Sequence, residues 1–426
     1  MTQLSSTLAA ATGSSAASRR AFIPLFLTLI CSAIGHAYFV ITFPAMAREY
    51  SLTDMQAGFV MGGGALVLTL AAPFWGWICD ARGRRFVVLF GSIGTTLGLA
   101  LLVLVFEAGE RQWLPMQTLL LSVLAVRWAQ SCASGGLMPA AQAVIADLTS
   151  PTQRSRGMGL LGGSFGVGTV LGGTLAMATG GEHVLEGFYL ITTALLLCCL
   201  WLWFSHPETA EDLSAAAVAA RHRSRWDGQQ QAPAEQSLRF GSMLPFLLTT
   251  LLCLTVYSLI QQITALRLQD DFGLDFNGSV QFAGRIMMVS MAAMIFSQLV
   301  LVALLRLTPQ RMAVLGAAVS CVALSMAAMA TDPQSLLLSM GFMGLGIGIL
   351  LPCNLALLSL AVGQRNQAKA AGVNGFSKGV GMAIGPILGA ALYASSTAMP
   401  YWLSAALLAA VLVAFIAMLL VKRGQY

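Results

Sequence analysis

Five residues within the apolar stretches of this 426-residue chain have side chains that could do chemistry. Arg127, Arg285 and Lys378 are cations, His36 can exchange a proton near neutral pH, and Gln130 follows Arg127 by three residues. All seventeen acidic residues lie in loops or near the ends of these stretches, so the sequence places no carboxylate beside the cations. The pattern predicts a buried site for an anionic, zwitterionic or polar chelating small molecule.

Two of these residues each admit a second interpretation. Arg127 lies about 16 Å into its stretch at 1.5 Å per residue. A charge at that depth costs about 2.5–3.5 kcal/mol, so it indicates a functional residue. The alternative is a structural arginine that binds carbonyl groups. His36 can carry a proton or simply pack. Asp54, Asp80 and Asp147, near the ends of stretches, are the alternative proton carriers.

The elements that must position these residues are membrane-spanning helices. The chain is 57% hydrophobic and only 9% charged, which excludes an ordinary soluble protein. Continuous apolar runs exclude a membrane barrel, whose strands alternate apolar with polar residues. About 20 apolar residues cross a bilayer, and eleven charge-free runs of at least 19 residues follow residue 20, namely 21–47, 55–79, 86–106, 128–146, 157–181, 187–207, 240–266, 286–305, 312–331, 333–364 and 379–421.

The last run is long enough for two crossings, with a turn at Ser395–Thr397. We therefore expect an all-α membrane protein of twelve spans. Seventeen of the 23 basic residues fall on one side when the amino terminus is placed in the cytoplasm, which predicts that both termini are cytoplasmic. The basic residues are scattered over separate loops, so the net charge of +6 indicates topology and no nucleic-acid partner.

A hydrophilic segment divides the chain into two sets of six spans. We expect a disordered cytoplasmic amino terminus (1–20), a six-helix bundle (21–204), a cytoplasmic linker (205–240), a second six-helix bundle (241–422) and a short tail (423–426). Two features recur about half the chain apart: Pro139 is echoed by Pro352, and the segment 168–173 by 385–390. A duplicated bundle with a site between its halves is the architecture of alternating-access transporters.

The loop between the second and third spans carries a motif, Gly76-Trp77-Ile78-Cys79-Asp80-Ala81-Arg82-Gly83-Arg84-Arg85. Gly83 permits a positive φ, and Gly76 permits close approach of a neighbouring helix. The motif resembles the signature loop of the major facilitator superfamily, apart from Ala81, where that family has a basic residue. The resemblance implies two bundles of the major facilitator fold. It also implies a cytoplasmic gate of Gly76, Asp80, Gly83, Arg84 and Arg85, with Asp147 as partner.

Two further motifs resemble the drug:proton antiporter branch of that family. Arg127-x-x-Gln130 resembles a motif of the fourth span that is tied to proton coupling, although Ser131 stands where the family has glycine. The fifth span resembles the antiporter motif, with Thr169 in place of its proline, and a mirror copy in the eleventh span has the proline. Both stripes are expected to pack helices closely or to act as hinges; they comprise Ser164, Gly168, Thr169, Gly172 and Gly173, and Gly381, Gly385, Pro386 and Gly389.

Together these features predict a proton-coupled exporter of a small polar, anionic or zwitterionic metabolite, siderophore or drug in the bacterial cytoplasmic membrane. An uptake symporter is the alternative, and an intramembrane enzyme or receptor a distant one, because the sequence shows no nucleophile, metal cluster or paired acids at membrane depth. We expect a monomer with no metal and no cofactor, in which the proton gradient drives transport and the partners are substrate, protons and the lipid bilayer.

Overall fold

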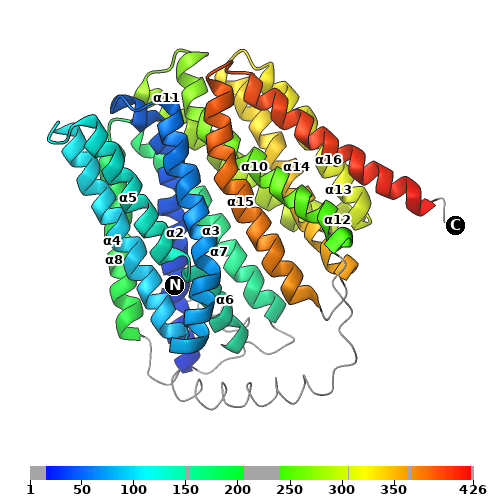
Figure 1. Ribbon diagram of the computed structural model, residues 1–426, viewed down its shortest axis with the longest axis horizontal. Coiled ribbons are helices and arrows are strands. Elements are labelled where there is room, and N and C mark those ends of the chain that lie inside the picture. The colour runs from blue at the N-terminus through cyan, green and yellow to red at the C-terminus, as the bar shows by residue number, and fades with distance from the viewer. Residues whose placement is uncertain (1–15, 149–153, 206–239, 306, 363–365, 424–426) are drawn as a thin grey trace.

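The computed structural model describes residues 16–148, 154–205, 240–305, 307–362 and 366–423, which form helices and their connecting turns (Figure 1). Eleven helices in this part of the chain are long and apolar enough to cross a membrane. The elements are α2 (Ala16–Glu49), α3 (Asp54–Arg82), α4 (Arg84–Glu110), α5 (Met116–Ser134), α6 (Leu137–Leu148), α7 (Arg154–Thr179), α8 (Val184–Ser205), α10 (Phe240–Asp270), α11 (Phe276–Phe296), η1 (Ser297–Leu301), α12 (Val302–Leu305), α13 (Pro309–Ala328), α14 (Pro333–Val362), α15 (Gln367–Tyr393) and α16 (Met399–Arg423).

The fourth crossing consists of two consecutive helices, α5 and α6, because the chain is interrupted at Gly135 and Gly136. A Cβ atom on Gly136 would lie 2.6 Å from the Val87 side chain and 2.8 Å from that of Trp75, so glycine is needed where α3 and α4 approach this break. With this crossing the described part of the chain has twelve, and the predicted all-α fold is confirmed.

Local signals in the sequence explain several helix ends. Thr53 and Gln56 form a capping box at the start of α3, and Asp275 caps α11 by accepting from the Gly278 amide. The predicted turn in the long final run is present, because α15 ends at Tyr393 and α16 begins at Met399. Residues 16–20 of the amino-terminal segment 1–20 form the start of α2, which corrects the disorder expected there. The rest of that segment, the linker 205–240 and the tail 423–426 lie almost entirely outside the described residues and stay predictions.

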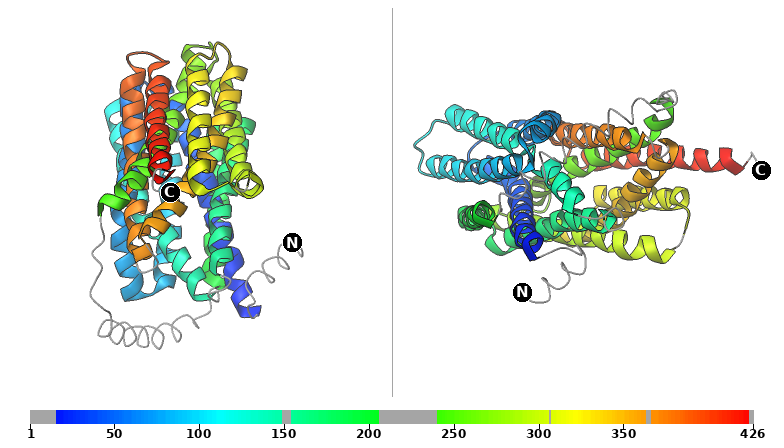
Figure 2. Two further views of the ribbon diagram at one scale, coloured as in Figure 1. Left: turned by 90° about the vertical axis from the view of Figure 1, so that its right-hand side faces the viewer. Right: turned by 90° about the horizontal axis from the view of Figure 1, so that it is seen from below.

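The helices form two halves related by pseudo-symmetry, α2 to α8 and α10 to α16 (Figures 1 and 2). In the first half α7 packs along α2, and at the equivalent place in the second half α15 packs along α10. Two equivalent pairs join the halves, α3 with α15 and α7 with α11. We call the end of the bundle at which α2 begins the terminal end, and the opposite end the distal end.

Arg267 is a charged residue in the core of the second half. It is only 2% exposed and lies in the last turn of α10, near the distal end. Its guanidinium donates to Asp271 (2.9 Å) and to the backbone carbonyls of Ala327 (2.6 Å) and Ala330 (3.2 Å), and it lies 4.5 Å over the ring of Tyr401. One side chain therefore joins α10 to the end of α13 and to α16.

Replacing Arg267 with methionine should destabilise the protein by about 2–3 kcal/mol, since it leaves Asp271 and two carbonyls without their donor. Thermal denaturation of the purified protein measures the effect, and Arg267→Lys should recover part of the loss. Arg111→Met is the matched control, because Arg111 is exposed and contacts only near neighbours in the sequence, Glu107 and Trp113. Equal melting temperatures for Arg267→Met and wild type would contradict the assignment.

Candidate functional site

Three residues singled out from the sequence meet at mid-depth in the first half. Arg127 of α5 donates through Nη1 to Oε1 of Gln130 (2.6 Å) and through Nη2 to Nδ1 of His36 on α2 (3.5 Å). Gln130 is 6% exposed, and its amide nitrogen donates to the Thr95 carbonyl of α4 (3.1 Å). The contacts tie α2, α4 and α5 together around one cation.

Small and aromatic neighbouring residues hold the guanidinium of Arg127 in position. Its Cζ atom lies 4.4 Å from the centre of the Phe39 ring, a distance at which a cation and an aromatic face attract. Gly64 of α3 lies beside the Arg127 side chain, and a Cβ there would make ordinary contact with its Cγ at 3.4 Å. Gly98 lets Gln130 pack against α4, since a Cβ there would overlap the Gln130 side chain. One glycine and one ring thus hold the two polar side chains in position.

Arg127 has hydrogen-bond partners but no counter-ion among the described residues. Its Nε atom is buried without a partner, and its two bonded acceptors are neutral. Burying a charge without an opposite one is unfavourable unless a ligand supplies the missing charge. The site therefore carries an uncompensated positive charge at the depth where a substrate would bind.

The contact with Arg127 defines the protonation of His36. A guanidinium can only donate, so Nδ1 of His36 must accept, and in the neutral ring the proton then resides on Nε2. A second proton would occupy Nδ1, remove this acceptor and place two cations side by side. His36 can therefore either bind a second proton or accept from Arg127, but not both at once.

The two other predicted cations lie in the second half and differ in position. Lys378 of α15 is exposed and interacts electrostatically with His36, so it faces the same space between the halves. Arg285 of α11 is also exposed, but it lies on the face opposite Ala283 and Met287, which point toward the centre. The expectation that Arg285 joins the other cations is corrected by this placement, because one helix cannot turn both faces inward.

Glycines show where the two halves touch. On the distal side, a Cβ on Gly62 of α3 would lie 2.3 Å from the Ala383 carbonyl of α15, and one on Gly173 of α7 would lie 3.0 Å from the Gly284 carbonyl of α11. Toward the terminal end, a Cβ on the described glycines of α7 and α15 would meet nothing within 4 Å at positions 159, 162, 163, 372 and 375. The halves are thus closed against each other at the distal end and open at the terminal end.

The two glycine stripes mostly pack inside their own halves. Gly168 and Gly172 contact α2, and Gly381, Gly385 and Gly389 contact α10, whereas Gly173 crosses to the other half. Ser164 and Thr169 donate to carbonyls of their own helix, and Pro386 presents its carbonyl to Gly58 of α3. Equivalent stripes on α7 and α15 thus do equivalent packing, while the contacts between halves use adjacent positions.

The signature loop lies at the open terminal end. Gly83 has φ +86°, which glycine adopts readily, so the expected positive φ is present. Asp80 is exposed and has no ion-pair partner among the described residues, and Arg84 and Arg85 are half-buried. Gly76 has open space beside it, which corrects the expectation of a close helix neighbour in this state. The Asp147 side chain lies outside the described part.

Sequence reasoning missed a cluster of charges at the distal end, which we call the distal lock. Arg48 of α2 donates to both carboxylate oxygens of Asp54 (2.8 Å each) and of Asp270 on α10 (2.8 and 2.9 Å), and to Gln269 (3.1 Å). The Tyr393 hydroxyl of α15 donates to Asp270 (2.8 Å). The sequence held only a partial signal: lysine and arginine are rare in the loops expected outside the cytoplasm, which singles out Arg48 but does not show which carboxylates it binds.

Among the described residues no group of three histidine, cysteine or acidic side chains could hold a metal ion.

Comparisons with known proteins agree on one family. A model of the Major Facilitator Superfamily matches residues 25–307 and 273–425. The chain is 26% identical over 351 residues to the multidrug resistance protein MdtG of Citrobacter koseri, covering 81% of this chain and 80% of that one. It is 27% identical to the class B tetracycline resistance protein of Escherichia coli over 207 residues, about half of either chain (47% and 48%).

Solved structures share the fold at low sequence identity. A POT family transporter in complex with 5-aminolevulinic acid superimposes with a TM-score of 0.71 at 11% identity, covering 92% of this chain and 95% of that one. The human organic anion transporter MFSD10 (TETRAN) gives a TM-score of 0.64 at 17% identity, covering 93% and 99%. Identities this low support the architecture alone.

Removing the distal lock should favour opening of the distal end. In Arg48→Met the ratio of distal-open to distal-closed molecules should rise about fivefold, the effect of losing about 1 kcal/mol from a partly exposed ion-pair network. Double electron–electron resonance between spin labels at positions 182 and 396, in a protein without its native cysteines, reports this ratio. Glu107→Gln is the control, because it breaks an ion pair within the first half. An unchanged distance distribution in Arg48→Met would contradict the role.

Proposed function

This chain belongs to the Major Facilitator Superfamily, and from that premise we propose that it is a proton-coupled exporter of a small anionic or zwitterionic metabolite, siderophore or drug. The multidrug and tetracycline resistance relatives support export. Membership of a transporter family decides against the enzyme considered from the sequence. We place the chain in the bacterial cytoplasmic membrane as a monomer, with the arginine-rich terminal end in the cytoplasm.

The observation that carries the proposal is the uncompensated charge of Arg127 in the space between the halves. Its two acceptors are neutral side chains, and Lys378 adds a second cation from the other half. An anionic group would bind here because it neutralises charge that the protein itself leaves unpaired. A cationic drug would meet repulsion at the same place.

Proton coupling follows from the competition at His36. With Nδ1 accepting from Arg127, the imidazole is neutral, which suits a state open to the cytoplasm after a proton has been released. Protonation breaks this contact and adds a third positive charge to a space that already holds Arg127 and Lys378. Substrate and proton thus act on one cluster of charges, as antiport requires. We propose that Asp54 serves the distal lock and carries no proton.

The observed state supports a cycle of alternating access. The distal lock and the glycine contacts close one end, while the terminal end is open. Substrate would enter from the cytoplasm, and opening of the distal end would release it outside. Closure of the terminal end would bring the signature loop, with Asp80 and Arg84, into contact with its partner.

An uptake symporter is the second candidate. Thr169, in place of the antiporter proline, donates to the Phe165 carbonyl and leaves α7 continuous, so the helix lacks the break of the antiporter motif. The same charge cluster would serve either direction. Comparing intracellular and secreted metabolites in a deletion strain decides between the two directions. Loss of an exporter leaves its substrate accumulated inside the cell, and loss of a symporter leaves it outside.

His36→Gln and Arg127→Lys should each lower proton-coupled transport about tenfold, as expected when about 1.4 kcal/mol of interaction is lost. Glutamine removes the titrating group, and lysine keeps the charge but cannot reach two acceptors in a fixed plane. Proton movement in inverted vesicles, driven by a compound to which the protein gives resistance, measures the effect. Arg285→Gln is the control, because Arg285 faces away from the centre. Wild-type proton movement in both His36 and Arg127 variants would overturn the assignment, as would resistance confined to cationic dyes.

A further inference from the structure

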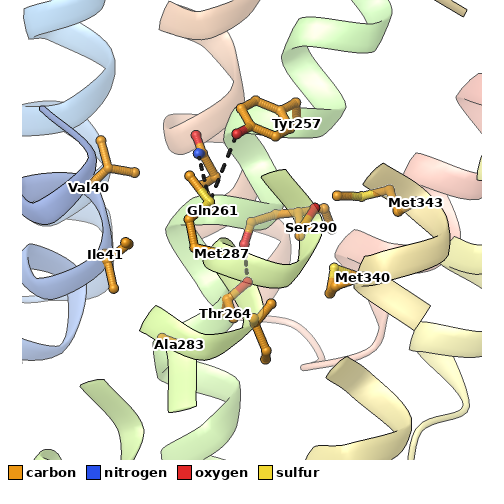
Figure 3. A pocket seen from close by; sticks show the side chains of 12 residues that line it. Val40, Ile41, Tyr257, Gln261, Thr264, Ala283, Met287, Ser290, Met340 and Met343 are labelled. Carbon is orange, nitrogen blue, oxygen red and sulfur yellow. Dashed lines mark hydrogen bonds between the residues drawn. The ribbon is translucent and has the colours of Figure 1, made fainter. Parts of the chain in front are cut away.

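A pocket of unusual chemistry lies beside the charge cluster. It lies between α2, α10, α11 and α14, and its roughly 420 Å³ of free space is partly open to solvent (Figure 3). Three methionines, Met287, Met340 and Met343, form much of its wall, and Val40 and Ile41 of α2 lie opposite them. The residues that line it include no charged side chain. Thioether side chains are flexible and polarisable, so such a wall adapts to differently shaped rings and makes favourable contacts with aromatic ones.

Two polar groups of the pocket are poorly satisfied. The Tyr257 hydroxyl and the Gln261 amide both donate to the sulfur of Met287, at 3.9 and 3.5 Å (Figure 3). A thioether sulfur is a weak acceptor, so an oxygen atom of a ligand would form stronger bonds with either donor. The pocket is therefore suited to an uncharged ring that bears a hydroxyl or carbonyl oxygen.

The pocket and the charge cluster adjoin along α2. Val40, in the pocket, follows His36 by one helical turn, and Phe39 lies beneath the guanidinium of Arg127. Residues four apart on a helix lie about 5–6 Å from each other, which is close to the width of one aromatic ring. One molecule can therefore reach both places, with its charge at Arg127 and its ring system among the methionines.

We infer that the pocket is a substrate subsite, and that the transported compounds are amphipathic aromatic anions: a carboxylate binds at Arg127, and an apolar ring, with or without an oxygen substituent, binds between Met287, Met340 and Met343. This inference rests on the proposed function, whose substrate class it specifies. A substrate must then carry, besides its charge, a ring system of sufficient length, because only a ring that extends past His36 reaches the thioethers.

Binding of three probes to the purified full-length protein, measured by isothermal titration calorimetry, tests the subsite. The probes are 2-naphthoate, benzoate and 2-naphthylmethylammonium. We expect 2-naphthoate to bind more tightly than either of the others, because benzoate ends short of the pocket and the ammonium is repelled by Arg127. In the double variant Met287→Ala/Met343→Ala the affinity for 2-naphthoate should fall about tenfold, while that for benzoate should stay within about twofold.

Two controls separate loss of the subsite from loss of the fold. Met326→Ala removes an exposed methionine of α13 and should leave all affinities unchanged. Met343→Leu keeps the side-chain volume and should cost less than Met343→Ala, so a binding-competent variant exists even if the double variant is unstable. Unchanged affinity for 2-naphthoate in the methionine variants, or equal affinity for the ammonium, would overturn the inference.

Proton movement in proteoliposomes distinguishes this failure from failure of the proposed function. If 2-naphthoate binds as expected but moves no protons, the subsite stands and proton coupling falls. If another compound moves protons while 2-naphthoate ignores the methionine substitutions, coupling stands and the aromatic subsite falls.

Discussion

A guanidinium at mid-depth in a membrane protein, with no carboxylate beside it among the described residues, is the constraint on which the rest of this structure depends. Arg127 is held by an amide, an imidazole and an aromatic ring, all uncharged in the geometry observed. These contacts fix its position without neutralising it, so the charge remains available to a ligand. Gly98 makes room for Gln130, because a Cβ there would overlap its side chain. Binding, proton exchange and movement of the halves all act on this one charge.

Apolar side chains of the two halves pack in one core, but part of the contact between the halves is made by backbone, and this part eases their movement. Gly62 and Gly173 bring α3 and α7 against carbonyls of α15 and α11, and such smooth surfaces can separate without repacking a core. The distal lock determines which end is closed, since Arg48 bridges carboxylates from both halves at the distal end. The residues that hold each half together, such as Arg267, lie away from this interface. Stability and mobility are thus assigned to different contacts.

The sequence predicted the fold and much of the site for identifiable physical reasons. Lipid demands continuous apolar helices, so span number followed from charge-free runs, although Arg127 hid the first half of the fourth span, which begins at Met116. Residues three apart on a helix must be neighbours, so Arg127 and Gln130 were paired in advance. The direction in which each helix face points was harder to predict. Arg285 has neighbours in the sequence that are as apolar as those of Arg127, and only tertiary packing shows that Arg285 points away from the centre. The distal lock joins residues over 200 positions apart, which no local pattern reveals.

The most direct test of the account is the response of the distal end to acid. Spin labels at positions 182 and 396 of the cysteine-free protein report the separation of the halves. Because the charges of Arg127 and Lys378 oppose protonation of His36, the titration runs from about pH 8 to about pH 4, well below the range of a free imidazole. We expect the wild-type distance distribution to shift toward the distal-open state at the acid end, because protonated His36 no longer accepts from Arg127, and we expect His36→Gln to abolish most of this shift. The distal carboxylates respond equally in both proteins. An identical shift in wild type and His36→Gln would contradict the central role of this contact.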